Sequence, residues 1–300
     1  MKPVTERFPG EENHSEAWDW HFSKRFCTPY WQKRSKKPPE TNTWYNMWYM
    51  LLTDYSKRRL TNSSDIFPAL SGLQTVFAAF TQDQLLAGPF SNDLERGLLW
   101  EVDLFQINHR ATPFRAPTWS WASVEGPVSW PFDINSEFIP GYKIQLVDHG
   151  TVSKAQKSED HLGADTHGEV GEGTYIKLLG RWRSTGSWDE ITIPTDSNST
   201  HWYLYDHHGM THATCSFDVG ANTDHIHPHF QKGDWGLLQI ATWDIYSHVD
   251  TTRVLYALIL RSVPGVDELY ERIGIAHIYT DDIATDAEIL DWEVKTLKIV

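Results

Sequence analysis

Three tryptophans lie close together in the stretch RAPTWSWASVEGPVSW, residues 115 to 130, here called the tryptophan segment. Indole rings at this spacing could shape an apolar cavity, and polar side chains beside them could orient a carbonyl or a phenol by hydrogen bonds. Such a site suits cyclisation, cycloaddition or isomerisation, which need shape and orientation in place of a nucleophile or a metal. The candidate catalytic residues are Asp103, His109 and Arg115, and the candidate ligand-binding residues are Trp100, Trp119, Trp121, Glu125 and Trp130.

The same indoles could instead fill the protein interior, which is the commonest use of paired aromatic residues. In an extended conformation Trp119 and Trp121 would point to one face and Ser120 to the other. Gly126 and Pro127 then predict a turn. We favour an aromatic corner where helices dock on a sheet, with the pocket as the alternative. The polar candidates likewise could be solvated charges or local salt bridges.

Fifteen histidines raise the possibility of a metal site. His225, His227 and His229 alternate, so in a strand their imidazoles would share one face. Pro228 disrupts a regular strand, however, and the surrounding Asn and Asp residues are typical of a polar surface loop. Three further histidines lie nearby, namely His207, His208 and His212. We expect a loop here and no metal.

Sequence motifs for other chemistries are absent. The chain has no GxSxG, GxGxxG, P-loop, HExxH or CxxC string, and its two cysteines, Cys27 and Cys215, lie in no recognisable electropositive niche. The absence of these motifs argues against nucleophilic catalysis and against a nucleotide cofactor. We therefore expect no cofactor.

Charge and hydropathy exclude further classes. A formal net charge of −14 over 300 residues argues against nucleic-acid binding, which needs clustered Lys and Arg. No run of about 18 apolar residues predicts a membrane span, and the N-terminus has no apolar signal core. The expected location is the cytoplasm.

The secondary structure that must position the candidate site is predicted to change along the chain from helices to strands. An apolar stripe predicts a helix over 44–56, a second helix is expected over 65–80, and a shorter helical piece over 91–102. Beyond residue 115, short apolar or alternating runs separated by Gly, Pro, Asp and Asn predict strands. Their ranges are 141–150, 173–182, 201–209, 234–243, 252–263, 270–279 and 294–300, with exposed loops expected over 153–173 and 184–200. The predicted fold class is mostly β with an α-helical N-terminal third (α+β), its antiparallel β body being barrel- or sandwich-like.

Several motifs in fixed order resemble a known family. They occupy residues 55–73, 85–100, 114–128, 175–182, 270–278 and 296–300, and together they are similar to the region that follows the HET domain in fungal heterokaryon-incompatibility proteins. Thr118 stands where that family usually has serine. The resemblance implies an irregular lead-in over 1–43 and one domain over 44–300, with a helical part over 44–112 and a β body over 113–300. The lead-in is too short for the HET domain itself, which is similar to TIR-type folds and is thought to carry the cell-death output.

Two functions therefore remain open. One is the binding of a bulky apolar small molecule in an aromatic pocket, with cofactor-independent cyclisation or isomerisation in fungal secondary metabolism as its enzymatic form. The other is a non-catalytic protein-recognition module of non-self recognition signalling, with a protein partner. A fragment without function is disfavoured because the motifs keep their order. The small molecule is slightly preferred, because a pocket needs no partner supplied by another chain.

Overall fold

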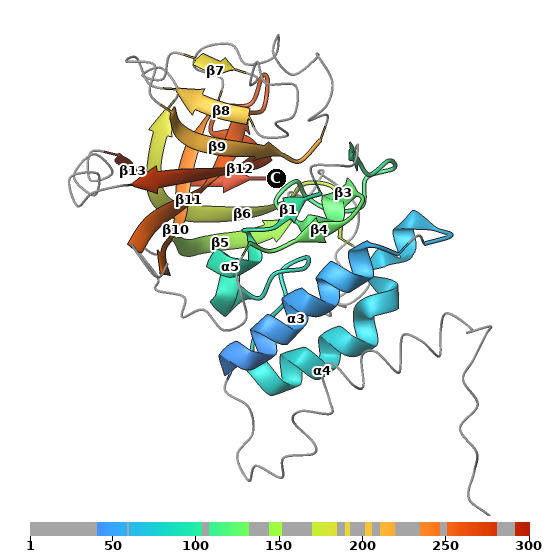
Figure 1. Cartoon of the computed structure of the whole chain (residues 1–300). Helices are drawn as coiled ribbons and strands as arrows, with labels where there is room; N and C mark the ends of the chain where they lie inside the picture. Colours follow the sequence, from blue (N-terminus) through green and yellow to red (C-terminus); the bar gives the residue numbers. More distant parts are fainter. Residues whose placement is uncertain are drawn as a thin grey trace, which may run out of the picture.

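The structure is a computed structural model that describes residues 41–58, 60–103, 108–131, 144–151, 170–184, 190–192, 202–205, 211–219, 235–246, 251–280 and 292–300. Helices lie in its N-terminal part and strands in the remainder (Figure 1). All strand pairs in the large sheet are antiparallel except β12 with β13. This confirms the predicted fold class.

Two antiparallel helices form the N-terminal layer. Helix α3 (Thr41–Ser56) buries Trp48, Leu52 and Tyr55, which recur at helical spacing, so the predicted helix over 44–56 is confirmed. The structure then places two 3-10 turns, η2 (Ser63–Ile66) and η3 (Pro68–Leu70), before α4 (Ser71–Thr81).

The two other helical predictions need correction at their ends. The predicted helix over 65–80 begins as an α-helix only at Ser71, because Pro68 has no N–H to donate to a preceding carbonyl. The Asn62 side chain, and not Ser64 or Asp65, caps the first turn. The piece expected over 91–102 is a short pair, η4 (Ser91–Asp93) and α5 (Leu94–Gly97).

A ring of five strands forms the body of the molecule. The pairings run from β11 to β10, β6, β13 and β12 and return to β11, so the sheet closes as a barrel. Strand β5 pairs with β6 outside the ring, and β9, β8 and β7 continue from β12. The strands are β5 (Gln145–Thr151), β6 (Thr174–Ser184), β7 (Glu190–Thr192), β8 (Trp202–Tyr205), β9 (Thr211–Phe217), β10 (Trp235–Tyr246), β11 (Thr251–Ser262), β12 (Leu269–Thr280) and β13 (Glu293–Ile299).

All seven predicted strand segments contain a strand, namely β5, β6, β8, β10, β11, β12 and β13. The loop expected over 184–200 is partly wrong, because Glu190–Thr192 forms β7 and pairs with β8. Strand β9 was missed, because its residues THATCSF alternate small and polar types without a strong apolar face. Most of the loop expected over 153–173 lies outside the described residues.

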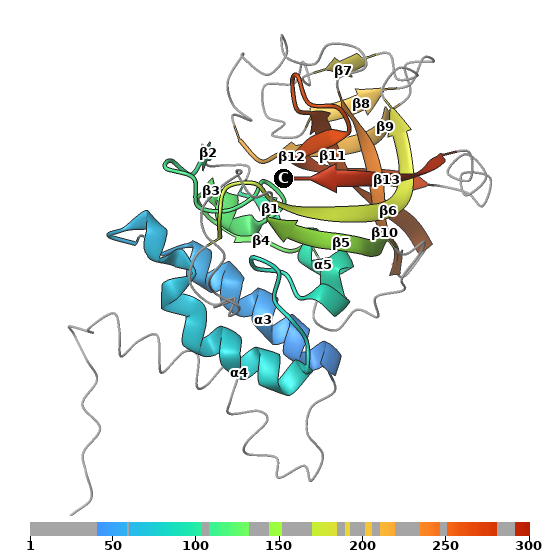
Figure 2. The ribbon, with the colours of Figure 1, turned by 180° about the vertical axis from the view of Figure 1, so that it is seen from behind.

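Two small sheets connect the barrel to the helices. Strand β1 (Glu101–Val102) pairs with β4 (Val128–Ser129), and β2 (His109–Arg110) pairs with β3 (Val124–Glu125). Seen from both sides, α3 and α4 lie beside this pair of sheets at one side of the barrel (Figures 1 and 2). The tryptophan segment runs between the helices and the barrel.

Three separate clusters of buried apolar side chains result from this arrangement. The barrel interior receives one or more side chains from each strand of the ring, for example Ile176, Leu238, Leu258, Ile275 and Leu297. The second core lies under α3 and α4 and contains most of the aromatic residues of the N-terminal part. A third cluster covers the outer face of β9 to β12.

Candidate functional site

Neighbouring tryptophans of the segment belong to different cores. Trp119 is 1% exposed and packs in the barrel core, whereas Trp121 is 2% exposed and packs in the helical core. The expectation that both indoles share one face is therefore wrong. Its physical reason is local: the Ser120 hydroxyl accepts from the Ala122 N–H and caps a 3-10 turn, η5 (Trp121–Ser123), in place of a straight strand.

The tryptophan segment acts mainly as structure. Trp100 and Trp130 are buried as well, and the Trp100 indole donates to the Trp119 main-chain oxygen at 3.0 Å. Among the described residues, the indole N–H groups of Trp119, Trp121 and Trp130 are buried without a hydrogen-bond partner. Large rings are thus placed for packing, as the favoured interpretation of the segment expected.

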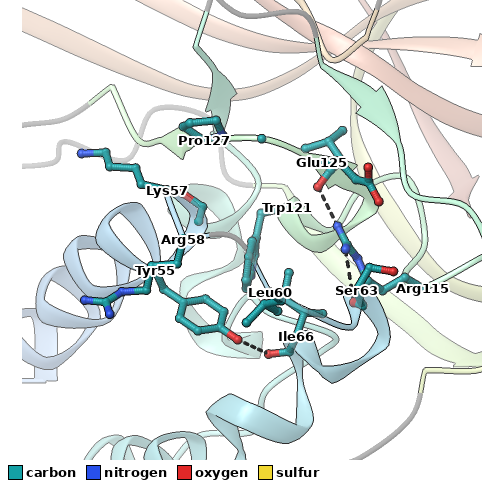
Figure 3. Close-up of a pocket in the computed structure, with 13 residues that line it drawn as sticks. Tyr55, Lys57, Arg58, Leu60, Ser63, Ile66, Arg115, Trp121, Glu125 and Pro127 are labelled. Atoms are coloured by element: carbon teal, nitrogen blue, oxygen red, sulfur yellow. Dashed lines mark hydrogen bonds between the residues drawn. The ribbon is translucent and has the colours of Figure 1, made fainter. Parts of the chain in front are cut away.

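One face of the segment nevertheless borders a pocket of about 670 Å³ (Figure 3). Its walls come from the end of α3, the chain that follows it, and the tryptophan segment. The lining residues are Tyr55, Ser56, Lys57, Arg58, Leu60, Ser63, Ile66, Arg115, Trp121, Val124, Glu125, Gly126 and Pro127. Three candidate site residues meet here, namely Arg115, Trp121 and Glu125.

Arg115 holds this pocket together. Its guanidinium donates to the main-chain oxygens of Ala122 at 2.6 Å, Val124 at 2.7 Å and Ser63 at 3.2 Å. These bonds tie the 3-10 turn after α3 to the segment. Burial lowers the pKa of the guanidinium, and the nearby Glu125 carboxylate acts in the opposite direction.

The apolar wall of the pocket is a set of packed rings. Tyr55 and Phe67 both meet the Trp121 ring edge to face, each with centroids 6.3 Å apart. The Tyr55 hydroxyl donates to the Ile66 main-chain oxygen at 3.2 Å, and burial raises its pKa. Behind Trp121, a Cβ at position 88 would lie 2.6 Å from the indole nitrogen, so glycine is required there.

The other candidates lie elsewhere. Asp103 uses its main-chain N–H to reach the Pro127 oxygen at 3.2 Å, and His109 is exposed in β2 opposite Glu125. Neither lines the pocket, and neither do Trp100, Trp119 or Trp130. The structure therefore does not unite the three candidate catalytic residues in one site.

A buried arginine joins the two layers and was missed by sequence reasoning. Arg272 of β12 is 0% exposed, and its guanidinium donates to the main-chain oxygens of Leu98 at 2.6 Å and Trp100 at 2.5 Å. Asp218 accepts from the same group at 3.2 Å. Burial lowers the Arg272 pKa to about 10, with the Asp218 carboxylate opposing that shift.

Thr118 of the tryptophan segment lies at the same junction. Its hydroxyl accepts from the Arg272 main-chain N–H at 2.8 Å and contacts the Val300 main-chain oxygen. The Thr118 N–H also donates to Val300 at 3.0 Å. A hydroxyl is the functional group that this position needs, and both threonine and serine supply one.

A second missed contact is an acid–histidine pair between β1 and β12. His277 Nε2 lies 2.7 Å from Glu101 Oε1, and the Tyr256 ring packs against the imidazole at 4.8 Å. Both side chains are only partly buried. The pair connects the small sheet to the barrel.

The histidines of the expected polar loop, His207, His208, His225, His227 and His229, lie outside the described residues, and the side chain of His212 is also not described. Within the described ranges, no group of three or more metal-ligating side chains is found. The thiol of Cys215 is buried, and burial raises its pKa to about 12. Among the helices of the described residues, none has the length and apolar character needed to cross a bilayer.

Models of protein families, curated proteins and solved structures were compared with this chain, and none of the three comparisons gives a match.

Proposed function

We propose that the chain is a binding module that holds a small molecule with a flat apolar body in the pocket between α3 and the tryptophan segment. The observation that carries this proposal is the meeting of Trp121 with Tyr55, Leu60 and Ile66 around a cavity of about 670 Å³. Ligand pockets have volumes of about 300–1,000 Å³ and combine apolar walls with a few polar groups. The volume of this pocket lies in that range, and its lining combines apolar side chains such as Leu60 and Pro127 with polar and charged ones.

A catalytic form of this proposal has little chemistry available in the pocket. Arg115 is the one candidate catalytic residue that reaches it, and its N–H groups bond to three main-chain oxygens. A cofactor-independent cyclisation or isomerisation would therefore rely on the shape of the cavity to orient its substrate. Binding is the part of the function that the geometry supports.

Ancestry in the heterokaryon-incompatibility family is part of the same proposal. It is supported by where the quoted motifs lie: Leu98, Leu99 and Trp100 are fully buried, and Thr118 bonds to Arg272 of the end motif. A protein-recognition module remains the second candidate. It is favoured by an exposed apolar pair on the outside of the helices, Val76 and Phe80, the latter 51% exposed and stacked on Trp44 at 4.2 Å.

The test is calorimetric titration with 2-naphthamide, a flat neutral probe. We expect saturable binding that Leu60→Trp weakens, because the larger ring fills part of the cavity. Val294→Trp is the matched control, because it places the same ring on an exposed position of β13. If the protein binds neither 2-naphthamide nor 2-naphthoate, the small-molecule proposal is contradicted. Protein recognition is then the better candidate.

A further inference from the structure

We infer that the ligand of this pocket carries an anionic group, which Lys57 and Arg58 bind at the end of α3. The inference rests on the proposed function and adds the chemical class of the ligand, a flat aromatic or polycyclic monoanion such as an aryl carboxylate.

The first step is the charge of the lining. Three cationic side chains, Lys57, Arg58 and Arg115, border the pocket, against the single acid Glu125. The whole chain carries a formal net charge of −14. A concave site that concentrates positive charge on a negative protein attracts anions selectively.

The second step concerns the hydrogen-bonding groups that the pocket offers. Three of its main-chain oxygens are occupied: Arg115 bonds to those of Ser63 and Val124, and the Tyr55 hydroxyl bonds to that of Ile66. The Ser56 hydroxyl is used by both main-chain groups of Val128. These acceptors are used by the protein, and the Glu125 carboxylate is a further acceptor on the opposite side, while the ammonium and guanidinium groups of Lys57 and Arg58 are donors. A ligand that accepts hydrogen bonds fits this inventory.

The third step fixes where the anion lies. Figure 3 shows Lys57 and Arg58 on one side of the pocket, Arg115 and Glu125 on the other, and Trp121 with Leu60 between them. Glu125 disfavours a negative group on its own side. The anion therefore binds at the α3 side, and the apolar body of the ligand lies over Leu60 and Pro127, the half-buried apolar side chains of the lining.

The two cations at that side share one acidic neighbour, Asp54 of α3. Lys57 and Arg58 are exposed, and the contact of the Lys57 ammonium with Asp54 is long, 3.9 Å, between side chains that are 58% and 42% exposed. Such surface pairs contribute little. Exchanging this contact for a carboxylate held beside an apolar wall costs the protein little and gains a charge-assisted hydrogen bond.

The experiment compares 2-naphthoate with 2-naphthamide, which share one ring system and differ in charge. Calorimetric titration of the whole chain should give an affinity for naphthoate about tenfold higher than for naphthamide. Lys57→Gln with Arg58→Gln should bring the two probes to the same affinity. Lys295→Gln on β13 is the control for loss of a distant positive charge, and it should preserve the preference.

The outcomes separate the anion site inferred here from the small-molecule binding on which it rests. Equal affinity for both probes in the unaltered protein overturns the inferred anion site and leaves small-molecule binding intact. A preference for naphthoate that survives the double substitution also overturns the inference, because other groups then hold the anion. Failure of both probes to bind removes the proposed function itself. Circular dichroism of the double variant shows that its fold is unchanged.

Discussion

The Arg272 guanidinium lies over the Trp100 ring at 3.5 Å from its centre and bonds to the main-chain oxygen of the same residue. One side chain of the barrel thus clamps both the ring and the backbone of the segment that leads from the helices. Arg110 extends this clamp, because its guanidinium reaches the Asp218 carboxylate at 3.2 Å and the Arg272 main-chain oxygen. The fixed relation of the helical layer to the barrel depends on this buried charge.

Loss of the clamp should be costly. Arg272→Met leaves Asp218 buried with only partial compensation, and breaking one partner of a buried ion pair costs about 3–5 kcal/mol. Chemical denaturation should show that loss in the free energy of unfolding. Arg261→Met is the matched control, because Arg261 pairs with Glu271 on the barrel surface at 39% exposure. A loss of at most about 1 kcal/mol is expected there. Similar effects of both substitutions would contradict the structural role of Arg272.

Removal of the Trp121 ring should also destabilise the fold. Trp121→Ala deletes a fully packed indole of the helical core and should cost about 3–5 kcal/mol. Phe80→Ala, at an exposed aromatic position, should cost far less. Urea denaturation followed by circular dichroism measures both, and a value near zero for Trp121→Ala would refute its place in the core.

Gly88 should tolerate no side chain. Its φ of +123° is strained for any other residue, and an added Cβ would lie 2.6 Å from the Trp121 indole nitrogen. Gly88→Ala should therefore lower the free energy of unfolding by about 1–3 kcal/mol. Gly72→Ala, in α4 with open space around the position, should be neutral or stabilising in the same denaturation experiment. Equal stability of the two variants would show that the contact with Trp121 is loose.

Arg115 should be irreplaceable by lysine. Arg115→Lys keeps the charge but loses the planar fork that reaches three main-chain oxygens, so stability should fall by about 2 kcal/mol or more. Thermal unfolding of Arg115→Lys and Arg115→Met should give similar losses. Full rescue by lysine would show that charge, and not the hydrogen-bond geometry, is what this position needs.

The pH dependence of stability should reveal Asp93. Burial raises the pKa of this carboxyl from 3.8 to about 6, although Arg96 and the Tyr49 hydroxyl bond to it. Because the folded state holds the proton more tightly, the unfolded chain loses it first as pH rises. The free energy of unfolding contributed by Asp93 therefore falls between pH 3.8 and about 6, by about 1.4 kcal/mol per unit of pKa difference.

Denaturation of the unaltered protein and of Asp93→Asn at several pH values measures this effect. The stability advantage of aspartate over asparagine should decline across that window. An advantage that grows with pH would mean that the pairing with Arg96 outweighs the burial of the carboxyl.

The sequence predicted the elements of this fold better than the contacts between them. Helix α3 was predictable because its stripe of large apolar residues has helical spacing, and the barrel strands because Gly, Pro and Asp punctuate short apolar runs. The division of Trp119 and Trp121 between two cores was not predictable. It depends on the Ser120 hydroxyl, which also bonds to the Ala87 main-chain oxygen, far away in the sequence.

The candidate site shows the same limit. Arg115, Trp121 and Glu125 were found from their unusual local composition, but the opposite wall of the pocket begins at Tyr55. Nothing local to residues 55–66 signals that they face the tryptophan segment. Arg272 was also hidden, because in its strand it resembles any polar residue of an alternating pattern. Its partners are separated from it by as many as 174 residues.

The closed ring of strands has a consequence for the order of folding. Strands β6 and β13 are far apart in the sequence, so they can pair only after the long segment between them has folded back. The ring also needs β13 to pair with β12 on its other side. Arg272 likewise meets Trp100 across 172 residues. Closing such long loops costs conformational entropy before the contacts add any stability, and this slows folding. The contacts of the helical layer span shorter distances in sequence, such as the 40 residues between Trp48 and Gly88, so this layer can assemble before the barrel closes.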